Sequence, residues 1–300
     1  MEILIDGNLR SAISRMFPIW RELGHRIAGS RPDVQLSSIK IRKFNKLPKV
    51  LRLDGIIYDS EIDWNQDNWN IKRSYSNADA VIFQSECCRE FSFRYFGKRE
   101  NTHIIYNGID HEQWYNPVEH KGINIVSCAN WRRWKRLPEI IRVFNHFRTN
   151  RTATLHIIGE MRRGAEEIPT ENVIYHGSIS EESIRELYKS ADLYLHLGKN
   201  DSCPSSVVEA IGAGIPVITT NACGGAMEMA KMAGNHIVEG DYQSYKPQKI
   251  YGENWNSISD ETIRGMSKLM NDVVRSIEFP EDLHIKTAAK KYLAVLESVI

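Results

Sequence analysis

The chain has 300 residues, of which 42% are hydrophobic and 26% charged, so its length and composition fit a globular protein of about two domains. The 39 Lys and Arg nearly balance the 38 Asp and Glu, which excludes a global basic field for nucleic acid or membrane but leaves room for a local patch. No apolar run approaches the ~20 residues of a membrane span, and the first residues carry acids where a signal peptide carries bases. The five cysteines form no CxxC pair. These features predict a cytoplasmic protein without a zinc site, a disulfide framework or stable membrane insertion.

Short β-rich runs alternate with helical patterns from end to end. In the first half, strands are expected at 2–6, within 49–59, at 78–85 and within 101–110, and helices at 11–23 and 86–97. In the second half, strands are expected at 123–129, 154–160, 171–178, 192–198 and 215–220, and helices at 137–148, 180–191 and 205–214. This alternation predicts an α/β protein with two Rossmann-like, doubly wound parallel-sheet domains. A ligand would bind in the cleft between them, at the carboxyl ends of the strands.

A polar, turn-rich segment at 112–122 marks the expected domain boundary. We therefore expect a reduced N-terminal domain at 1–115, which would face the acceptor. A larger domain at 116–285 would bind the donor, and a C-terminal helix would follow at 286–300.

The stretch from Lys199 to Thr220 is the most informative part of the sequence. A helix is expected to begin near Ser205, capped by Ser205 or Ser206, and its free N–H groups suit a phosphate. Asp201 and Glu209, with seven residues between them, would repel that phosphate unless they meet hydroxyl groups. A ligand with phosphate between two polyols satisfies both needs, and a nucleotide sugar is such a ligand.

These residues resemble the retaining GT-B glycosyltransferases of family four, also called glycosyl transferases group 1. Members of that family carry two acids with seven residues between them, then small residues and PVI, as Asp201, Glu209 and AIGAGIPVITT do here. The first acid is usually Glu in the family. Four further segments, which fit the same family, are NGID (107–110), SCANWRRWKRLPEII (127–141), HIIGE (156–160) and GGAMEMA (224–230).

The resemblance covers residues 75 to 230 and implies transfer of a sugar from a nucleoside-diphosphate sugar to an acceptor hydroxyl, with retention. It implies that Asp201 faces the sugar hydroxyls and Glu209 the ribose hydroxyls. Arg132 and Lys135 would meet the diphosphate, with Arg133 and Arg136 as competitors. The other donor-binding candidates are Gly7, Gly159, Glu160, Gly177, Ser205, Ser206, Val207, Gly224 and Gly225.

Neither a metal nor another cofactor is expected, because the chain has no D-x-D motif and its acids do not cluster with His as metal ligands. Fixed cations and helix N–H groups can stabilise the leaving diphosphate instead. Asp54 follows a strand at a position where the family often has His. It is a candidate contact to the donor sugar or to the acceptor hydroxyl, and the alternative is an ordinary Asp-Gly turn.

From Arg31 to Arg52, seven cations accompany only one acid, Asp33. This stretch is either a solvated face or a patch for an anionic acceptor: a lipid-linked glycan or phospholipid headgroup, an acidic glycan, or DNA. Two alternatives to the leading function therefore stay open. One is the same transfer onto a hydroxymethylated DNA base, and the other is a sugar-nucleotide-binding protein that has lost catalysis.

Overall fold

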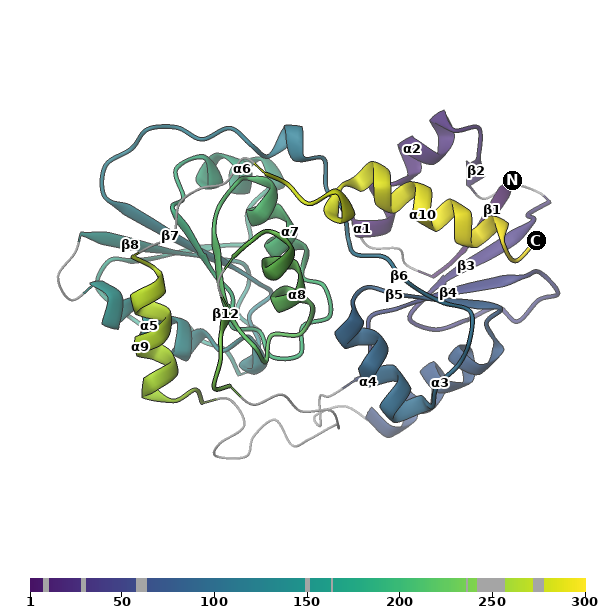
Figure 1. Ribbon diagram of the computed structural model, residues 1–300, viewed down its shortest axis with the longest axis horizontal. Helices are drawn as coiled ribbons and strands as arrows, with labels where there is room; N and C mark the ends of the chain where they lie inside the picture. The colour runs from purple at the N-terminus through teal and green to yellow at the C-terminus, as the bar shows by residue number, and fades with distance from the viewer. Residues whose placement is uncertain are drawn as a thin grey trace. The chain divides into compact units, whose positions relative to one another are not determined.

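The computed structural model describes residues 1–300 apart from 8–10, 28–30, 58–63, 149–151, 163, 236, 242–256 and 272–277. The described residues form two compact units, one of 1–109 with 281–300 and the other within 110–280. Each unit is built on one parallel six-stranded sheet with helices packed against it (Figure 1). The predicted α/β class with two Rossmann-like domains is therefore confirmed. The cleft expected between them stays a prediction.

The first unit has the strand order β2-β1-β3-β4-β5-β6, and every neighbouring pair is parallel. The strands are β1 (Glu2–Asp6), β2 (Arg26–Ile27), β3 (Val34–Ser38), β4 (Lys49–Leu53), β5 (Ala80–Phe83) and β6 (Thr102–Ile104). The helices are α1 (Ser11–Ser14), α2 (Phe17–Glu22), α3 (Trp64–Asn77), α4 (Glu86–Phe96) and α10 (Ile285–Glu297).

Alternate residues of the central strands enter two different cores. Val50 and Ile82 pack with α2 and α10, whereas Leu51 and Phe83 pack with α3 and α4. Because both faces of the sheet are covered, nearly every residue of β4 and β5 is buried, and exposed polar residues do not alternate with apolar ones.

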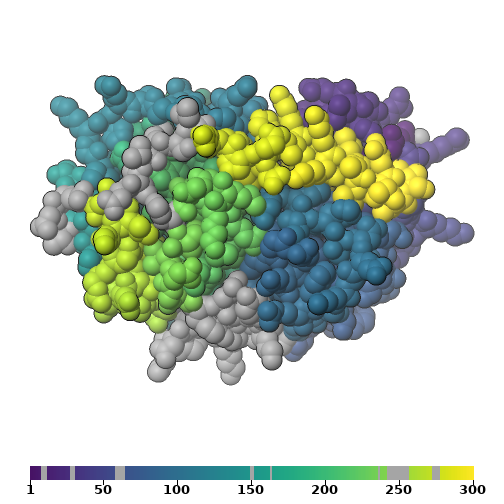
Figure 2. Space-filling model, in the orientation of Figure 1, coloured from purple at the N-terminus to yellow at the C-terminus, as the bar shows by residue number. Residues whose placement is uncertain are grey.

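The C-terminal helix α10 completes the N-terminal core. The Trp20 indole donates a hydrogen bond to the Ala289 carbonyl at 3.0 Å, and Ile285 also lies in that core. A Cβ on Gly108 would lie 2.7 Å from the Ile285 Cα, so the returning chain requires glycine there. Figure 2 shows the yellow C-terminal residues against the purple N-terminal ones. The helix expected as a separate C-terminal element is therefore part of the first unit.

The second unit has the strand order β12-β11-β10-β7-β8-β9, again all parallel. The strands are β7 (Ile123–Cys128), β8 (Ala153–Ile158), β9 (Val173–Gly177), β10 (Leu193–Leu195), β11 (Val217–Thr220) and β12 (Ile237–Val238). The helices are α5 (Leu137–Phe147), α6 (Glu181–Lys189), α7 (Ser205–Gly212), α8 (Gly225–Met232) and α9 (Asp260–Leu269). Helices α5 and α9 cover one face of the sheet, and α7 and α8 contact β11.

Each predicted strand and helix has a counterpart, with two differences. The helix expected at 11–23 is split into α1 and α2, because Pro18 stands in the first turn of α2. Of the stretch expected to hold a strand at 49–59, residues 58 and 59 lie outside the described part. The chain as described contains no helix long and apolar enough to cross a membrane.

The basic stretch from Arg31 to Arg52 is not one continuous surface. Strand β3 within it is buried at every position, and Arg52 is only 7% exposed. The Arg52 guanidinium is held by Asp54 through an ion pair of 2.6 Å. The stretch therefore supplies two central strands, and only the part between them stands largely in solvent.

Candidate functional site

Three loops of the second unit meet at the carboxyl ends of β7, β10 and β11. The Lys199 amide donates to the Trp134 carbonyl at 3.0 Å, which joins the loop after β10 to the turn after β7. The Gly225 amide donates to the Asp201 carbonyl at 2.8 Å, which joins the same loop to the start of α8. Backbone bonds therefore hold the side chains of this edge in fixed positions.

Lys135 and Asp201 form an ion pair at the centre of these loops. Lys135 ends the short 3₁₀ turn Arg133–Lys135, and its ammonium donates to Asp201 Oδ2. Both side chains are mostly buried, at 17% and 18% exposure. Burial raises the pKa of Asp201, but the charges of Lys135, His196 and Arg132 outweigh it, so the pKa lies below its ordinary value. The structure thus brings together Arg132, Lys135 and Asp201.

His196, which belongs to none of the predicted site residues, lies beside this pair. Its Nε2 is 3.5 Å from Asp201 Oδ2, and its side chain is only 4% exposed. Burial lowers the pKa of His196 to about 4, although Asp201 opposes the shift, so the imidazole is neutral at pH 7. Its place near the end of the predicted strand 192–198 was the signal that could have identified it.

Helix α7 begins at Ser205 and carries Glu209 one turn further on. The expected cap by Ser205 or Ser206 is wrong, because Pro204 occupies the N-cap position and makes no side-chain cap. Ser205, Ser206 and Val207 are instead the first helical residues. The N-cap residue therefore provides no side-chain cap for the first N–H groups of the helix, and a helix N-terminus suits an anion.

Glu209 is 7% exposed, and its charge reaches the ends of β7 and β10. Burial raises the pKa of Cys128 to about 12, Glu209 adds to the shift, and Lys135 opposes it. Glu209 and Lys135 therefore both lie close enough to Cys128 to act on it.

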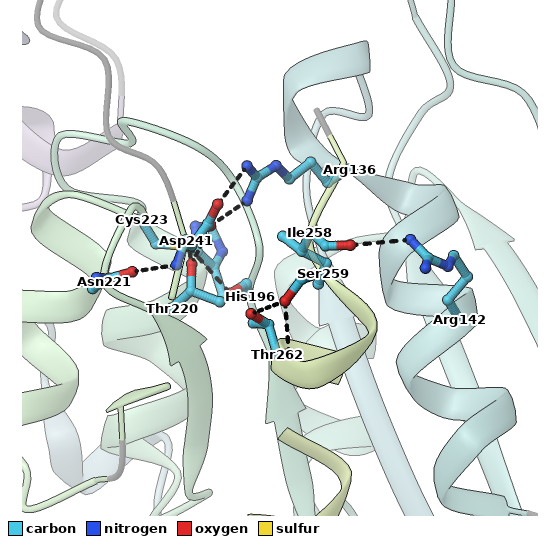
Figure 3. A network of polar contacts seen from close by, with 10 residues as sticks. All are labelled: Arg136, Arg142, His196, Thr220, Asn221, Cys223, Asp241, Ile258, Ser259 and Thr262. Carbon is cyan, nitrogen blue, oxygen red and sulfur yellow. Dashed lines mark hydrogen bonds and ion pairs between the residues drawn. The ribbon is translucent and has the colours of Figure 1, made fainter. Parts of the chain in front are cut away.

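Arg136 has a different role from its neighbours (Figure 3). Its guanidinium donates two hydrogen bonds to the Asp241 carboxylate, at 2.6 and 3.1 Å, and both side chains are buried. Thr220 donates a third hydrogen bond to Asp241, at 2.6 Å. Both terminal nitrogens of the Arg136 guanidinium, which could otherwise bind a diphosphate, are thus bonded to Asp241. This pairing excludes Arg136 as the competitor of Arg132 and Lys135.

The glycines at the ends of β8 and β9 bring the next turn close. The Gly159 amide donates to the Gly177 carbonyl at 2.7 Å, and a Cβ on Gly159 would lie 1.8 Å from the Ala129 carbonyl oxygen. The Trp131 amide donates to the Glu160 carbonyl at 2.9 Å, while the Glu160 carboxylate pairs with Arg162. This group is therefore linked to the turn that carries Arg132 and Lys135.

Gly224 occupies a backbone conformation that only glycine adopts readily, with φ 61° and ψ −127°. It is the N-cap of α8, and Gly225 is the first residue of that helix. The segment 224–230 therefore forms the start of α8, and the first residue of this helix is bonded to the Asp201 carbonyl.

Residues 109–247 match the family model described as glycosyl transferases group 1. We call residues 109–247 the group 1 domain after this match. A comparison with curated protein sequences gives no significant match.

The whole chain is similar to solved GT-B glycosyltransferase structures. AviGT4, a glycosyltransferase involved in avilamycin A biosynthesis, is 12% identical with a TM-score of 0.65 over 100% of this chain and 98% of that chain. HepE of Anabaena, in complex with UDP-glucose, is 14% identical with a TM-score of 0.64 over 100% and 98%. WaaG, a glycosyltransferase involved in lipopolysaccharide biosynthesis, is 14% identical with a TM-score of 0.61 over 99% of each chain. The predicted GT-B fold is confirmed.

The turn that carries Lys135 also carries Arg132 and Arg133. Arg133 is exposed, and the Arg132 guanidinium lies 5.2 Å from the centre of the Trp134 ring. Trp131 is 1% exposed and donates to the Ile158 carbonyl at 2.9 Å, so it packs in the core.

Asp54 and Gly7 lie outside the group 1 domain, in the first unit. The Asp54 carboxylate is 45% exposed and accepts hydrogen bonds from Arg52, at 2.6 Å, and from Gln84. Asn107 closes this network by accepting from Arg52 at 3.2 Å and donating to Gln84 at 3.0 Å. Asp54 is therefore held by two side chains, Arg52 and Gln84, which Asn107 links to each other, and it is more than a residue of an ordinary turn.

Gly7 follows β1 with a φ of 112°, and a Cβ there would lie 1.9 Å from the Arg42 guanidinium. The positive φ, which L side chains rarely adopt, explains why glycine stands at this position. Among the residues that the structure describes, no three His, Cys, Asp or Glu side chains are grouped to hold a metal ion.

Proposed function

We propose that the protein transfers a sugar from a nucleoside-diphosphate sugar to an acceptor hydroxyl, with retention and without a metal. The observation that carries the proposal is the convergence of Lys135, Arg132 and Asp201 in front of the N-terminus of α7. A diphosphate between two polyols needs cations and N–H groups for its phosphates and carboxylates for its hydroxyls. The group 1 domain offers all of these at one edge of its sheet.

In this reaction, the bond between the anomeric carbon and the diphosphate oxygen breaks, and its electron pair moves to that oxygen. Arg132, Lys135 and the N–H groups of Ser205, Ser206 and Val207 stabilise the developing charge. Asp201 accepts hydrogen bonds from the sugar hydroxyls. The acceptor oxygen forms the new bond, and its proton passes to the leaving diphosphate.

Glu209 is proposed to accept hydrogen bonds from the ribose hydroxyls, because it is a buried acid on the same helix. Gly159, Glu160, Gly177, Gly224 and Gly225 complete the donor site through their backbone, and Arg133 adds positive charge at its edge. Asp54 and Gly7 are proposed to contribute from the first unit, with Asp54 in contact with the donor sugar or the acceptor hydroxyl.

UDP-hexoses are the first donors to test, because the similar HepE was solved with UDP-glucose. We propose a glycan or lipid-linked glycan as acceptor and cytoplasm as the site of action. Transfer onto DNA has no specific support, because the basic stretch 31–52 is partly buried and has no uninterrupted exposed face.

The test incubates the protein with a panel of nucleotide sugars, with EDTA present, and follows release of nucleoside diphosphate. Slow release from one donor, abolished by Glu209→Ala, supports the proposal. The matched control is Glu182→Ala, which removes an exposed acid from the first turn of α6 and should leave release unchanged. The anomeric configuration of the product, read by NMR, tests retention.

The result also separates an enzyme from a protein that only binds sugar nucleotides. Thermal stabilisation by one donor, with no release and no transfer to any acceptor offered, would favour the binding protein. Neither release nor stabilisation would refute the glycosyltransferase proposal.

A further inference from the structure

Helix α3 in the first unit exposes a large aromatic side chain among cations. Trp69 is 57% exposed, and Lys72 and Arg73 follow it at the spacings i+3 and i+4, which places them beside it on the helix surface. The opposite side of the helix is buried, because Ile71 and Tyr75 lie in the core beneath the sheet. Helix α3 therefore has an apolar inner face and an aromatic and basic outer face.

A second aromatic side chain is fixed beside α3 by the loop after β3. The Ile41 amide donates to Ser74 Oγ of α3 at 2.8 Å, and the Arg42 amide donates to the buried Asp6 carboxylate at 2.7 Å. Phe44, which is 45% exposed, follows these two anchors, and the Arg73 guanidinium lies 4.6 Å from the centre of its ring. The loop and the helix therefore form one built surface.

We call this surface the aromatic–basic face and define it as the loop 39–48 with the outer side of α3. Its two segments carry a single acid, Asp67, which is 3.8 Å from Lys40 in a half-exposed pair. Such a pair is screened by water and leaves the field of the face positive. The cations of the two segments are Lys40, Arg42, Lys43, Lys46, Lys72 and Arg73.

The combination of charge and exposed rings identifies the partner. Cations alone would fit any polyanion, but neither a polyphosphate nor an acidic glycan provides an apolar phase for Trp69 and Phe44. The loop and α3 enclose a hollow of about 210 Å³ lined by Lys40, Arg42, Phe44 and Arg73, and the indole of Trp69 is not part of its lining. A bilayer interface accepts aromatic rings at the level of the headgroups, and anionic lipids attract the neighbouring Lys and Arg.

We propose that the aromatic–basic face docks the protein on an anionic lipid surface. Trp69 and Phe44 insert at the headgroup level, and the surrounding cations bind lipid phosphates. The hollow between the loop and α3 accommodates one phosphate headgroup, held by Arg42 and Arg73. This docking depends only on the first unit, so it holds whether or not the group 1 domain proves active.

The experiment is sedimentation of the full chain with phosphatidylcholine vesicles that contain either no or one third phosphatidylglycerol. We expect binding to the anionic vesicles and weak or no binding to the neutral ones. Raising the salt concentration should weaken binding, because exposed charges are screened. Absence of binding to anionic vesicles at low salt would overturn the proposal.

Three variants separate docking from a general affinity for polyanions. Lys72→Gln with Arg73→Gln should weaken vesicle binding tenfold or more, since each cation near an anionic membrane contributes about 1 kcal/mol. Lys231→Gln with Lys268→Gln removes the same charge from exposed positions of the second unit and should have no effect. Trp69→Ala should weaken binding to vesicles severalfold while binding to heparin, a polyanion without an apolar phase, stays unchanged.

If Trp69→Ala leaves vesicle binding unchanged, or if all exposed cations contribute equally, the face is not a lipid-docking surface. The far-ultraviolet circular dichroism and the melting temperature of each variant are measured in parallel. Unchanged values show that the variant is folded, and loss of vesicle binding alone then supports the proposal.

Discussion

The ammonium of Lys135 donates a hydrogen bond to the carboxylate of Asp201, although 66 residues separate the two in the chain. Each is delivered by a loop at the carboxyl end of a different strand, and the strands β7 and β10 are neighbours in the sheet. Opposite charges are thereby held at the start of α7 before any ligand arrives. In the proposed reaction, a donor would exchange this pair for its own phosphate and hydroxyl groups.

Replacing Lys135 by Ala is expected to lower the rate of nucleoside-diphosphate release about 100-fold, by analogy with the loss of one preorganised donor to a developing negative charge. The matched change Lys231→Ala removes an exposed cation from α8 and should leave the rate within twofold of the unmodified protein. Steady-state kinetics with the active donor measures both. Equal rates for Lys135→Ala and the unmodified protein would exclude Lys135 from the reaction.

His196 makes the second unit sensitive to acid. Its pKa is about 4 when folded, against about 6.5 in an unfolded chain. Between these values the unfolded chain binds a proton that the folded protein rejects, so the free energy of unfolding decreases as the pH falls through this window. The whole difference amounts to on the order of 3 kcal/mol at 1.36 kcal/mol for each unit of pKa.

His196→Gln cannot titrate and should lose that part of the pH dependence. We expect the free energy of unfolding of the variant to change less between pH 7 and pH 4.5 than that of the unmodified protein. His156, whose pKa burial lowers to about 4 with a further contribution from His176, continues to titrate in both proteins. Urea unfolding of both proteins at the two pH values measures this difference. If the two proteins showed identical pH dependence, His196 would not be buried in its neutral form.

Arg136 and Asp241 should be coupled in stability. Arg136→Met leaves the Asp241 carboxylate buried without its cation, which is expected to cost 3–5 kcal/mol by the order of magnitude of such losses. Adding Asp241→Leu removes the isolated charge and should recover most of that loss. The free energies of unfolding of the two single variants and the double variant, measured by chemical unfolding, form a double-mutant cycle. A double variant as unstable as the sum of the two single ones would refute the coupling.

The elements of this fold follow closely from the sequence, because their signals are local. The strand expected to end at Gly198 and the helix expected to begin near Ser205 can be identified from the hydrophobic pattern and composition of the sequence alone. Their order also places Asp201 at a strand end, where parallel sheets gather their ligands. To predict that Asp201 lies beside the turn after β7, only the correct strand order was therefore needed.

Pairings across long distances in the chain were not predictable in this way. Nothing near Arg136 distinguishes it from Arg132 or Arg133, because its partner Asp241 is 105 residues away. The return of α10 to the N-terminal core is likewise a matter of packing, since its own sequence does not say which apolar surface it covers. The short strand β3 was missed because the cations around it dominate the composition of 31–52.

Two glycines at neighbouring strand ends give a direct test of backbone packing. Gly159 has a φ of 110°, and a Cβ there would lie 1.8 Å from the Ala129 carbonyl oxygen, whereas a Cβ on Gly177, at a φ of 63°, would meet nothing within 4 Å. Gly177→Ala should therefore cost only the ~1–2 kcal/mol of a left-handed residue with a side chain. Gly159→Ala must also displace the loop after β7, and we expect the free energy of unfolding to fall by more than about 3 kcal/mol.

Because Ala129 precedes the turn that carries Arg132 and Lys135, Gly159→Ala should also abolish stabilisation by nucleotide sugars. Urea unfolding and thermal-shift measurements on both variants check this, and equal losses of stability would contradict the close approach at Gly159.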